Sequence, residues 1–307
     1  MGRPNIKRRV VNGILVLDKP LDVSSNGALQ RVKFLYRAKK AGHTGSLDPL
    51  ATGVLPLCFG EATKFSQFLL DAHKKYRTVI KLGVTTTTGD AEGEVVAEAP
   101  VETLTKAGLE AVLEQFRGPI EQVPSMYSAI KVDGKPLYKL ARQGIEIERK
   151  SRSVEIFDLD LVSLQGDLVC LDVHCSKGTY IRTLAEDIGK VLGCGAHVAE
   201  LRRTASGPFS LEQAYTVAEL EQCLEDKGEA GLDELLLSPA EALPDWPSVE
   251  LTELSASYLR QGQPVQIAKA PTTGWVRIFS ESQDPAFIGV GEIMEDGRVA
   301  PRRLVAY

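Results

Sequence analysis

The segment at residues 42–53 contains a carboxylate in a setting that suits catalysis. It reads Gly-His-Thr-Gly-Ser-Leu-Asp-Pro-Leu-Ala-Thr-Gly, so that Asp48 lies among three glycines, with His43 five residues upstream. So much glycine and proline is unsuited to the interior of a helix or strand and predicts a shaped loop, where binding and catalytic groups concentrate. An ionised carboxylate held there can act as a nucleophile. The competing interpretation is a plain turn, in which the carboxylate of an Asp-Pro pair caps a backbone N–H.

Two further segments place polar side chains at glycine or proline turns. Segment 176–183 reads Ser-Lys-Gly-Thr-Tyr-Ile-Arg-Thr, and its glycine permits a sharp turn from a strand into a helix. Tyr180 and Arg182 then lie at the start of that helix, where their side chains can point back over the end of the sheet. On residue type alone, Arg182 could equally belong to a surface ion pair and Tyr180 to the core. The third segment is Leu-Asp-Lys-Pro at 17–20, followed by two serines.

The charge of the chain is divided unevenly. Its formal net charge of −5 conceals an acidic stretch at 211–250 with eleven Asp or Glu and one Lys, so the rest of the chain is basic. Basic residues gather in three clusters, at 22–48, 73–77 and 131–152. Any one cluster could be a solvated surface, but three of them beside glycine-rich loops favour an anionic partner.

Composition excludes several classes of protein. No apolar run approaches the roughly 18 residues that span a bilayer, and the basic N-terminus lacks the apolar core of a signal peptide. The five cysteines form no C-x-x-C pair, which predicts reduced thiols, a cytoplasmic protein and no zinc site. At 307 residues the chain is expected to fold as one large and one small domain.

Apolar periodicity predicts alternating strands and helices. The predicted helices are one that Ser24 or Ser25 caps and those at 61–70, 104–116, 179–192, 217–224 and 253–261. The predicted strands lie at 13–17, 54–59, 76–82, 128–132, 153–163, 168–175 and 197–204 and, near the C-terminus, at 264–268, 275–280, 286–293 and 299–305. This pattern favours a mixed α/β fold of the α+β type. Two prolines at 243–247 predict a boundary, with one domain at 1–250 that ends in the acidic helical segment 211–250, and a small, mostly β domain at 251–307.

Together these segments closely resemble the TruB family of bacterial tRNA pseudouridine(55) synthases. Segment 17–25 resembles the family's opening motif, 42–53 its loop around the catalytic aspartate, and 176–183 its Ser-Lys-Gly-Thr-Tyr-Ile-Arg-Thr motif. Other stretches match in the same order, so that the resemblance covers nearly the whole chain: 60–67, 124–129, 193–198, 201–203 and 301–305. It implies a pseudouridine synthase catalytic domain followed by a PUA-type RNA-binding domain. One departure is Asp22, where the family commonly has glycine, although aspartate tolerates a left-handed backbone better than most residues.

The resemblance implies an isomerase that converts a uridine in the T-loop of tRNA, at position 55, to pseudouridine. The N-glycosidic bond breaks and the ribose is rejoined to C5, a reaction that uses no cofactor and no metal. Asp48 is the implied nucleophile, and attack at the ribose, attack at the base and assisted elimination all stay open. Arg182 is expected beside it, where the positive charge would lower the pKa of the carboxyl group.

The resemblance also assigns the residues that hold the base. The uridine is expected to flip out of its loop, with Tyr76 stacked on it and close to the C5 proton. His43 is expected to fill the gap that the base leaves, with a structural loop histidine as the alternative. Tyr180 and Leu201 are expected to line the uracil pocket.

The implied partner is free tRNA, bound without a guide RNA and without a membrane by a cytoplasmic monomer. Lys19 and Lys64 are assigned to the substrate-binding set, through phosphate contact or through loop structure. Two alternatives stay open: a non-catalytic protein that binds and folds tRNA, and the guide-RNA-dependent dyskerin branch of the same superfamily. The absence of long basic tails and the acidic stretch at 211–250 argue against the second.

Overall fold

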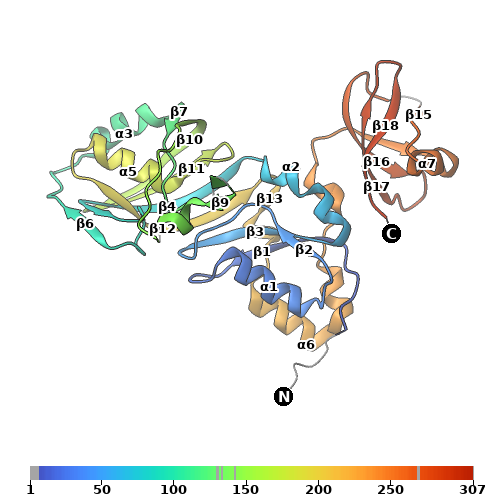
Figure 1. Cartoon of the computed structure of the whole chain (residues 1–307), viewed down its shortest axis with the longest axis horizontal. Coiled ribbons are helices and arrows are strands. Elements are labelled where there is room, and N and C mark those ends of the chain that lie inside the picture. Colours follow the sequence, from blue (N-terminus) through green and yellow to red (C-terminus); the bar gives the residue numbers. More distant parts are fainter. Residues whose placement is uncertain (1–6, 129–130, 133, 142, 268–269, 307) are drawn as a thin grey trace.

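The structure is a computed structural model that describes residues 7–128, 131–132, 134–141, 143–267 and 270–306. Its largest element is a nine-stranded sheet (Figure 1). Its order is β1-β3-β12-β4-β11-β10-β7, with β2 paired to β3 and β13 to β12. Its strands are β1 (Gly13–Lys19), β2 (Ala41–His43), β3 (Ala51–Phe59), β4 (Lys74–Leu82), β7 (Gly118–Gln122), β10 (Arg152–Gln165), β11 (Leu168–Cys175), β12 (Ala196–Ser206) and β13 (Phe209–Ser210). The short pairing of β3 with β12 is parallel, whereas the other pairings described in this sheet are antiparallel.

Helices pack against both ends of this sheet (Figure 1). Near β1 and β3 lie α1 (Ser25–Leu35) and α6 (Val217–Glu234), and near β4 and β10 lie α3 (Lys106–Leu113) and α5 (Ile181–Val191). The shorter elements are α2 (Ser66–Leu70), α4 (Leu137–Ala141), the 3₁₀ turns η1 (Gly60–Phe65), η2 (Glu114–Phe116), η3 (Leu211–Gln213) and η4 (Pro239–Ala242), and the hairpins of β5 (Val84–Thr86) with β6 (Val95–Glu98) and of β8 (Lys131–Val132) with β9 (Lys135–Pro136). No helix in the described ranges combines the length and the apolarity that a membrane crossing needs.

The mixed α/β fold is confirmed, and the structure corrects the sequence prediction at several elements. Segment 42–53 is not a loop throughout, because β2 includes His43 and β3 begins at Ala51, so that the loop itself is 44–50. Gly42 and Gly53, at the two ends of this segment, are paired residues of β2 and β3. The predicted helix at 61–70 is a 3₁₀ turn followed by the short α2, and within the predicted strand at 128–132 only β8 forms, since 129–130 lie outside the described residues.

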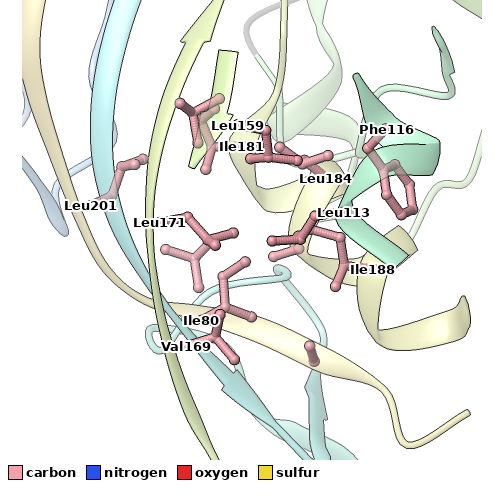
Figure 2. Close-up of a cluster of buried hydrophobic side chains, with 14 of the residues drawn as sticks. Ile80, Leu113, Phe116, Leu159, Val169, Leu171, Ile181, Leu184, Ile188 and Leu201 are labelled. Carbon is pink, nitrogen blue, oxygen red and sulfur yellow. The ribbon is translucent and has the colours of Figure 1, made fainter. Parts of the chain in front are cut away.

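Two apolar clusters anchor the two ends of the sheet. One lies between the sheet and α3 and α5, where Ile80, Leu113, Leu171 and Leu184 are all fully buried (Figure 2). The other lies beneath α1 and α6 and includes Leu15, Leu57 and Val32 among its buried members. Because burial of a side chain of this size stabilises a fold by about 1.5–3 kcal/mol, these clusters hold the two ends rigidly with respect to the strands between them.

The acidic helix α6 pairs with part of the basic cluster at 22–48. Arg31 forms an ion pair with Glu221 (2.7 Å), and Arg37 forms one with Glu229 (2.7 Å). These side chains are between 38% and 61% exposed, so each pair contributes only about 0–1 kcal/mol. Their main consequence concerns charge. Two of the cations that suggested an anionic partner are already matched within the chain.

The C-terminal unit is a five-stranded sheet with one helix, at the far right of Figure 1. Its elements are β14 (Ser248–Leu251), α7 (Glu253–Arg260), β15 (Val265–Gln266), β16 (Gly274–Ser280), β17 (Phe287–Ile293) and β18 (Arg298–Leu304). The sequence analysis missed β14, which pairs in parallel with β16, and the predicted domain boundary falls within this strand. The C-terminal unit contacts the 3₁₀ turn η1, which directly follows β3 of the first sheet. Phe65 of η1 packs against Phe287 of β17 with ring centroids 5.4 Å apart.

Candidate active site

The loop that carries Asp48, residues 44–50 (the Asp48 loop), is tied to the start of α1. The hydroxyl of Ser25 accepts from the backbone N–H of Leu47 (2.7 Å) and donates to the Leu47 carbonyl (2.9 Å). The Leu47 side chain is buried in the cluster beneath α5. A reciprocal pair of hydrogen bonds and a buried side chain therefore hold the residue next to Asp48 in place.

Arg182 lies in the first turn of α5 and reaches two carboxylates. Its Nη2 atom is 3.1 Å from Oδ2 of Asp48, and its Nη1 atom is 3.3 Å from Oδ2 of Asp90. The guanidinium also donates to the carbonyls of Thr88 (2.9 Å) and Tyr127 (2.8 Å). The side chains of Arg182 and Asp90 are only 7% and 3% exposed. Asp90 and the two carbonyls therefore aim a buried arginine at Asp48.

A cavity of about 280 Å³ opens beside Asp48. Its wall contains five of the eight residues that the sequence analysis assigned to the site: Asp48, Tyr76, Tyr180, Arg182 and Leu201. They come from the Asp48 loop, β4, the start of α5 and β12, so elements far apart in the sequence converge on one small space. A wider hollow of about 1170 Å³ lies near β5 and β6, and its described lining holds none of the five.

The cavity wall combines apolar surface with hydroxyl-bearing and charged side chains. Tyr76 packs against the apolar cluster of Figure 2, and Leu201 is a buried member of that cluster. Tyr180 precedes α5, and the Gln122 side chain holds its backbone by accepting from its N–H (3.0 Å) and donating to its carbonyl (3.2 Å). A wall with both apolar and polar side chains suits a flat polar ring such as a nucleobase, because the faces of the ring can be buried while its polar edge is bonded.

His43 lies outside the cavity wall, at the last position of β2. Its side chain is half-buried, and its Nδ1 atom has no hydrogen-bond partner among the described residues. Burial lowers the pKa of His43, and the positive charge of Arg203 lowers it further. The imidazole is therefore neutral at pH 7, which suits a ring that packs against other rings better than one that must carry a charge.

Lys19 does not occupy a position from which it could contact a phosphate. Its side chain is fully buried, and its Nζ atom donates to the carbonyls of Pro20 (2.7 Å), Val23 (2.6 Å) and Pro49 (3.2 Å). The last of these acceptors lies in the Asp48 loop. Of the two roles considered from the sequence, the geometry favours loop structure and contradicts phosphate contact.

Lys64 also lies away from the cavity. Its Nζ atom pairs with Glu61 (2.6 Å) and donates to the carbonyl of Leu304 in β18 (2.8 Å). Arg303 in turn donates to the backbone carbonyl of Lys64 (2.9 Å). Lys64 therefore connects η1 to the C-terminal unit, and the geometry gives it a structural role between the two.

The charge of Arg182 is only one of the influences on the pKa of Asp48. Burial raises the pKa of Asp48, whereas the charge of Arg182 lowers it and that of Asp90 raises it. The charge of Arg182 acts in the expected direction, but the net direction of the pKa shift is upward. The reason is that loss of hydration outweighs one ion pair, although the Asp48 side chain is still 43% exposed at the mouth of the cavity.

Three buried charges at the site received no role from the sequence: Asp90, Arg203 and Lys74, which is 7% exposed and lines the cavity. Asp90 was not singled out, because an Asp in a Gly-Asp turn has no local pattern that distinguishes it from other turns. Arg203 belonged to a stretch used for the family resemblance, 201–203, but received no role. It is 1% exposed and lines the cavity. Asp22 has a left-handed backbone, with φ of 60°, as expected for a position where the family commonly has glycine.

Solved structures establish the fold. The chain is similar to one from "Crystal Structure of a Cbf5-Nop10-Gar1 Complex", with a TM-score of 0.73 at 24% identity, covering 99% of this chain and 91% of that chain. It is also similar to one from "Structure of H/ACA RNP bound to a substrate RNA containing 2'-deoxyuridine", with a TM-score of 0.73 at 23% identity, covering 100% and 92%. The mixed sheet with a C-terminal β unit is thus the pseudouridine synthase fold.

Family models and relatives make the assignment narrower. Residues 33–181 match the TruB family pseudouridylate synthase N-terminal domain, 182–243 the tRNA pseudouridylate synthase B C-terminal domain, and 247–305 the C-terminal domain of pseudouridine synthase II TruB. The chain is 59% identical to tRNA pseudouridine synthase B of Pseudomonas aeruginosa (strain UCBPP-PA14) and 60% identical to that of Stutzerimonas stutzeri (strain A1501), each over 97% of both chains. The chain belongs to the TruB family of pseudouridylate synthases.

Proposed function

We propose that this enzyme converts the uridine at position 55 in the T-loop of tRNA to pseudouridine without a guide RNA, with Asp48 as the nucleophile on a flipped-out base. The observation that supports this most directly is the Asp48–Arg182 ion pair in the wall of a small cavity that also contains Tyr76 and Leu201. The choice of tRNA is supported by relatives of 59% and 60% identity that are named tRNA pseudouridine synthases.

The proposed chemistry needs one ionised carboxylate and a site that holds a base through a rotation. The bond from ribose C1′ to N1 of uracil breaks, and a bond from C1′ to C5 forms, while C5 loses a proton and N1 gains one. Asp48 acts as nucleophile at the ribose or at the base, or assists elimination. Arg182 keeps the carboxylate oriented and favours its charged form, because an opposite charge at 3.1 Å opposes the effect of burial.

The free-energy cost of extracting the uridine from its loop also has to be offset. Unstacking costs a few kcal/mol, and stacking on an aromatic side chain returns about 1–3 kcal/mol per base. Tyr76 supplies that ring in the cavity wall, beside the buried Leu201. We assign His43, which is neutral and lies outside the cavity wall, to the gap that the base leaves in the RNA loop.

The RNA backbone needs cations that the chain does not neutralise itself. In the cluster at 73–77, Lys74 is buried and Arg77 pairs with Asp172 (2.7 Å). In the cluster at 131–152, by contrast, the described side chains of Lys135, Lys139, Lys150 and Arg152 are all exposed. We therefore assign the main phosphate contacts to the 131–152 cluster, with a PUA-type C-terminal unit as a second RNA-binding surface.

The proposal is tested with purified protein and an unmodified tRNA transcript in the absence of any other RNA. We expect pseudouridine at one T-loop position, position 55, mapped by chemical adduct formation and primer extension. A matched transcript with cytidine at that position is the control and should acquire none. Modification at other uridines, or none in the first transcript, would contradict the proposal.

The raised pKa of Asp48 predicts how the rate depends on pH. Because only the ionised carboxylate is a nucleophile, the single-turnover rate should fall with acid around a midpoint above 3.8, the ordinary Asp value. Arg182→Gln removes the charge that opposes burial, so the midpoint should move to still higher pH. Circular dichroism at each pH checks that the protein stays folded. A wild-type midpoint at or below 3.8 would show that the ion pair outweighs burial.

Lys19→Met tests the corrected role of Lys19. Loss of a phosphate contact should reduce the slope of log Kd for tRNA against log salt by about 1, so we expect an unchanged slope. We expect instead a loss of about 1–3 kcal/mol in stability, because three backbone carbonyls lose their donor. Lys150→Met, at an exposed position in the 131–152 cluster, is the matched control and should reduce the slope. The same reduction of the slope in both variants would show that Lys19 contacts a phosphate.

A further inference from the structure

Arg203 is a buried cation on the floor of the cavity at a point where three strands meet. Arg203 belongs to β12, where it pairs in parallel with Gly53 of β3 and antiparallel with Tyr76 of β4. The approach to β3 is very close, because a Cβ atom on Gly53 would lie 2.2 Å from the Arg203 carbonyl oxygen. The backbone of Arg203 is therefore held tightly between the strand that follows the Asp48 loop and the strand that carries Tyr76.

The guanidinium of Arg203 binds backbone carbonyls in place of a carboxylate. Its Nε atom donates to the carbonyl of Val54 (2.7 Å) and its Nη2 atom to that of Gly45 (3.1 Å). None of the ion pairs in the described residues includes Arg203, whereas its neighbour Arg202 is paired with Asp18. A buried charge without a counter-charge lowers stability relative to an apolar side chain, and the two carbonyls partly offset this cost.

The same guanidinium acts on Tyr76. Burial raises the pKa of the Tyr76 phenol, the charge of Arg203 lowers it, and Cys175 and Asp48 raise it. Both residues line the cavity, so the charge of the guanidinium and the ring of Tyr76 belong to the same small site.

We propose that Arg203 is a positioning residue for the reaction, because its guanidinium holds the Asp48 loop while its backbone pairs with Tyr76. Gly45, which accepts from Arg203, is three residues from Asp48 in the same loop. The carboxylate and the stacking ring are thus located from a common point, and a base that contacts the ring meets the carboxylate in a set geometry. This inference rests on the proposed function, in which Asp48 and Tyr76 both contact the flipped uridine.

Arg203→Lys separates this role from charge alone, since lysine keeps the positive charge but lacks the fork that bridges Gly45 and Val54. We expect the single-turnover rate on tRNA to fall about a hundredfold, the effect of misplacing reactive groups by about 1 Å. We expect Kd for tRNA to stay unchanged, because Arg203 is buried. Arg202→Lys is the matched control: it is the adjacent residue of β12, its side chain bonds Asp18 (2.6 Å), and its rate should remain that of the wild type.

A double-mutant cycle identifies the path of the effect. In a Ser25→Ala background, which removes the other side-chain anchor of the Asp48 loop, Arg203→Lys should lower the rate by a larger factor than in the wild type. Enzyme excess and long incubation keep slow rates measurable. An equal factor in both backgrounds, a wild-type rate for Arg203→Lys, or equal losses for Arg203→Lys and Arg202→Lys would overturn the proposal. Failure of the proposed function looks different, because the wild-type protein itself would then leave position 55 unmodified.

Discussion

Asp48→Asn is expected to reduce pseudouridine formation by at least about 10⁴-fold, the scale seen when an enzyme loses its nucleophile. An amide has nearly the shape of the carboxylate, but it is a far weaker nucleophile. Stability should not suffer, because burial already disfavours the charge at this position. The measurement is a single-turnover assay on the tRNA transcript, together with Kd for the same RNA and the thermal midpoint.

The control for this substitution is Asp160→Asn, which removes one exposed carboxylate from β10, outside the cavity wall. It should leave rate, affinity and thermal midpoint unchanged. The expected pattern for Asp48→Asn is a lost rate with retained binding. A rate near that of the wild type would remove Asp48 as the nucleophile, whatever the other parameters show.

Arg182→Met is expected to affect both stability and rate. Arg182 is the ion-pair partner of Asp90, whose side chain is 3% exposed, so its loss leaves a buried carboxylate uncompensated. The expected cost is about 3–5 kcal/mol in the free energy of unfolding. We expect the rate to fall by about 10²–10³-fold at a temperature where the variant is still folded, since Asp48 loses the donor that orients it. Chemical denaturation and single-turnover kinetics measure the two effects.

The double variant Arg182→Met with Asp90→Asn distinguishes these effects. Neutralising Asp90 removes the uncompensated charge, so much of the stability should return, whereas the rate should not, because Asp48 still lacks its arginine. Recovery of both would mean that Arg182 acts through stability alone. Recovery of neither would mean that the carbonyls of Thr88 and Tyr127, rather than Asp90, depend most on the arginine.

The elements of this fold were predictable where the pattern is local. The strands β4, β10 and β11 and the helix α5 lie close to the positions that apolar periodicity predicts, because each buries one regular face. The short strand β14 was missed, since four residues carry too little periodicity and its partner β16 lies more than twenty residues further along the chain. The glycines in β2 and β3 misled for a related reason, because their acceptance in a strand depends on the partner strand.

The residues of the site also divide into those that the sequence predicts and those that only the tertiary structure reveals. Asp48, its glycine-rich loop and the turn before Arg182 could be recognised in the sequence, because the residue types and their spacing lie within short segments. The burial of Lys19, the pairing of Asp90 with Arg182 and the position of Arg203 between Gly53 and Tyr76 emerged only when distant strands came together. The direction of the Asp48 pKa shift belongs with them. Hydration, the Arg182 charge and the Asp90 charge act on one carboxylate at once, and their balance depends on distances that a linear sequence does not contain.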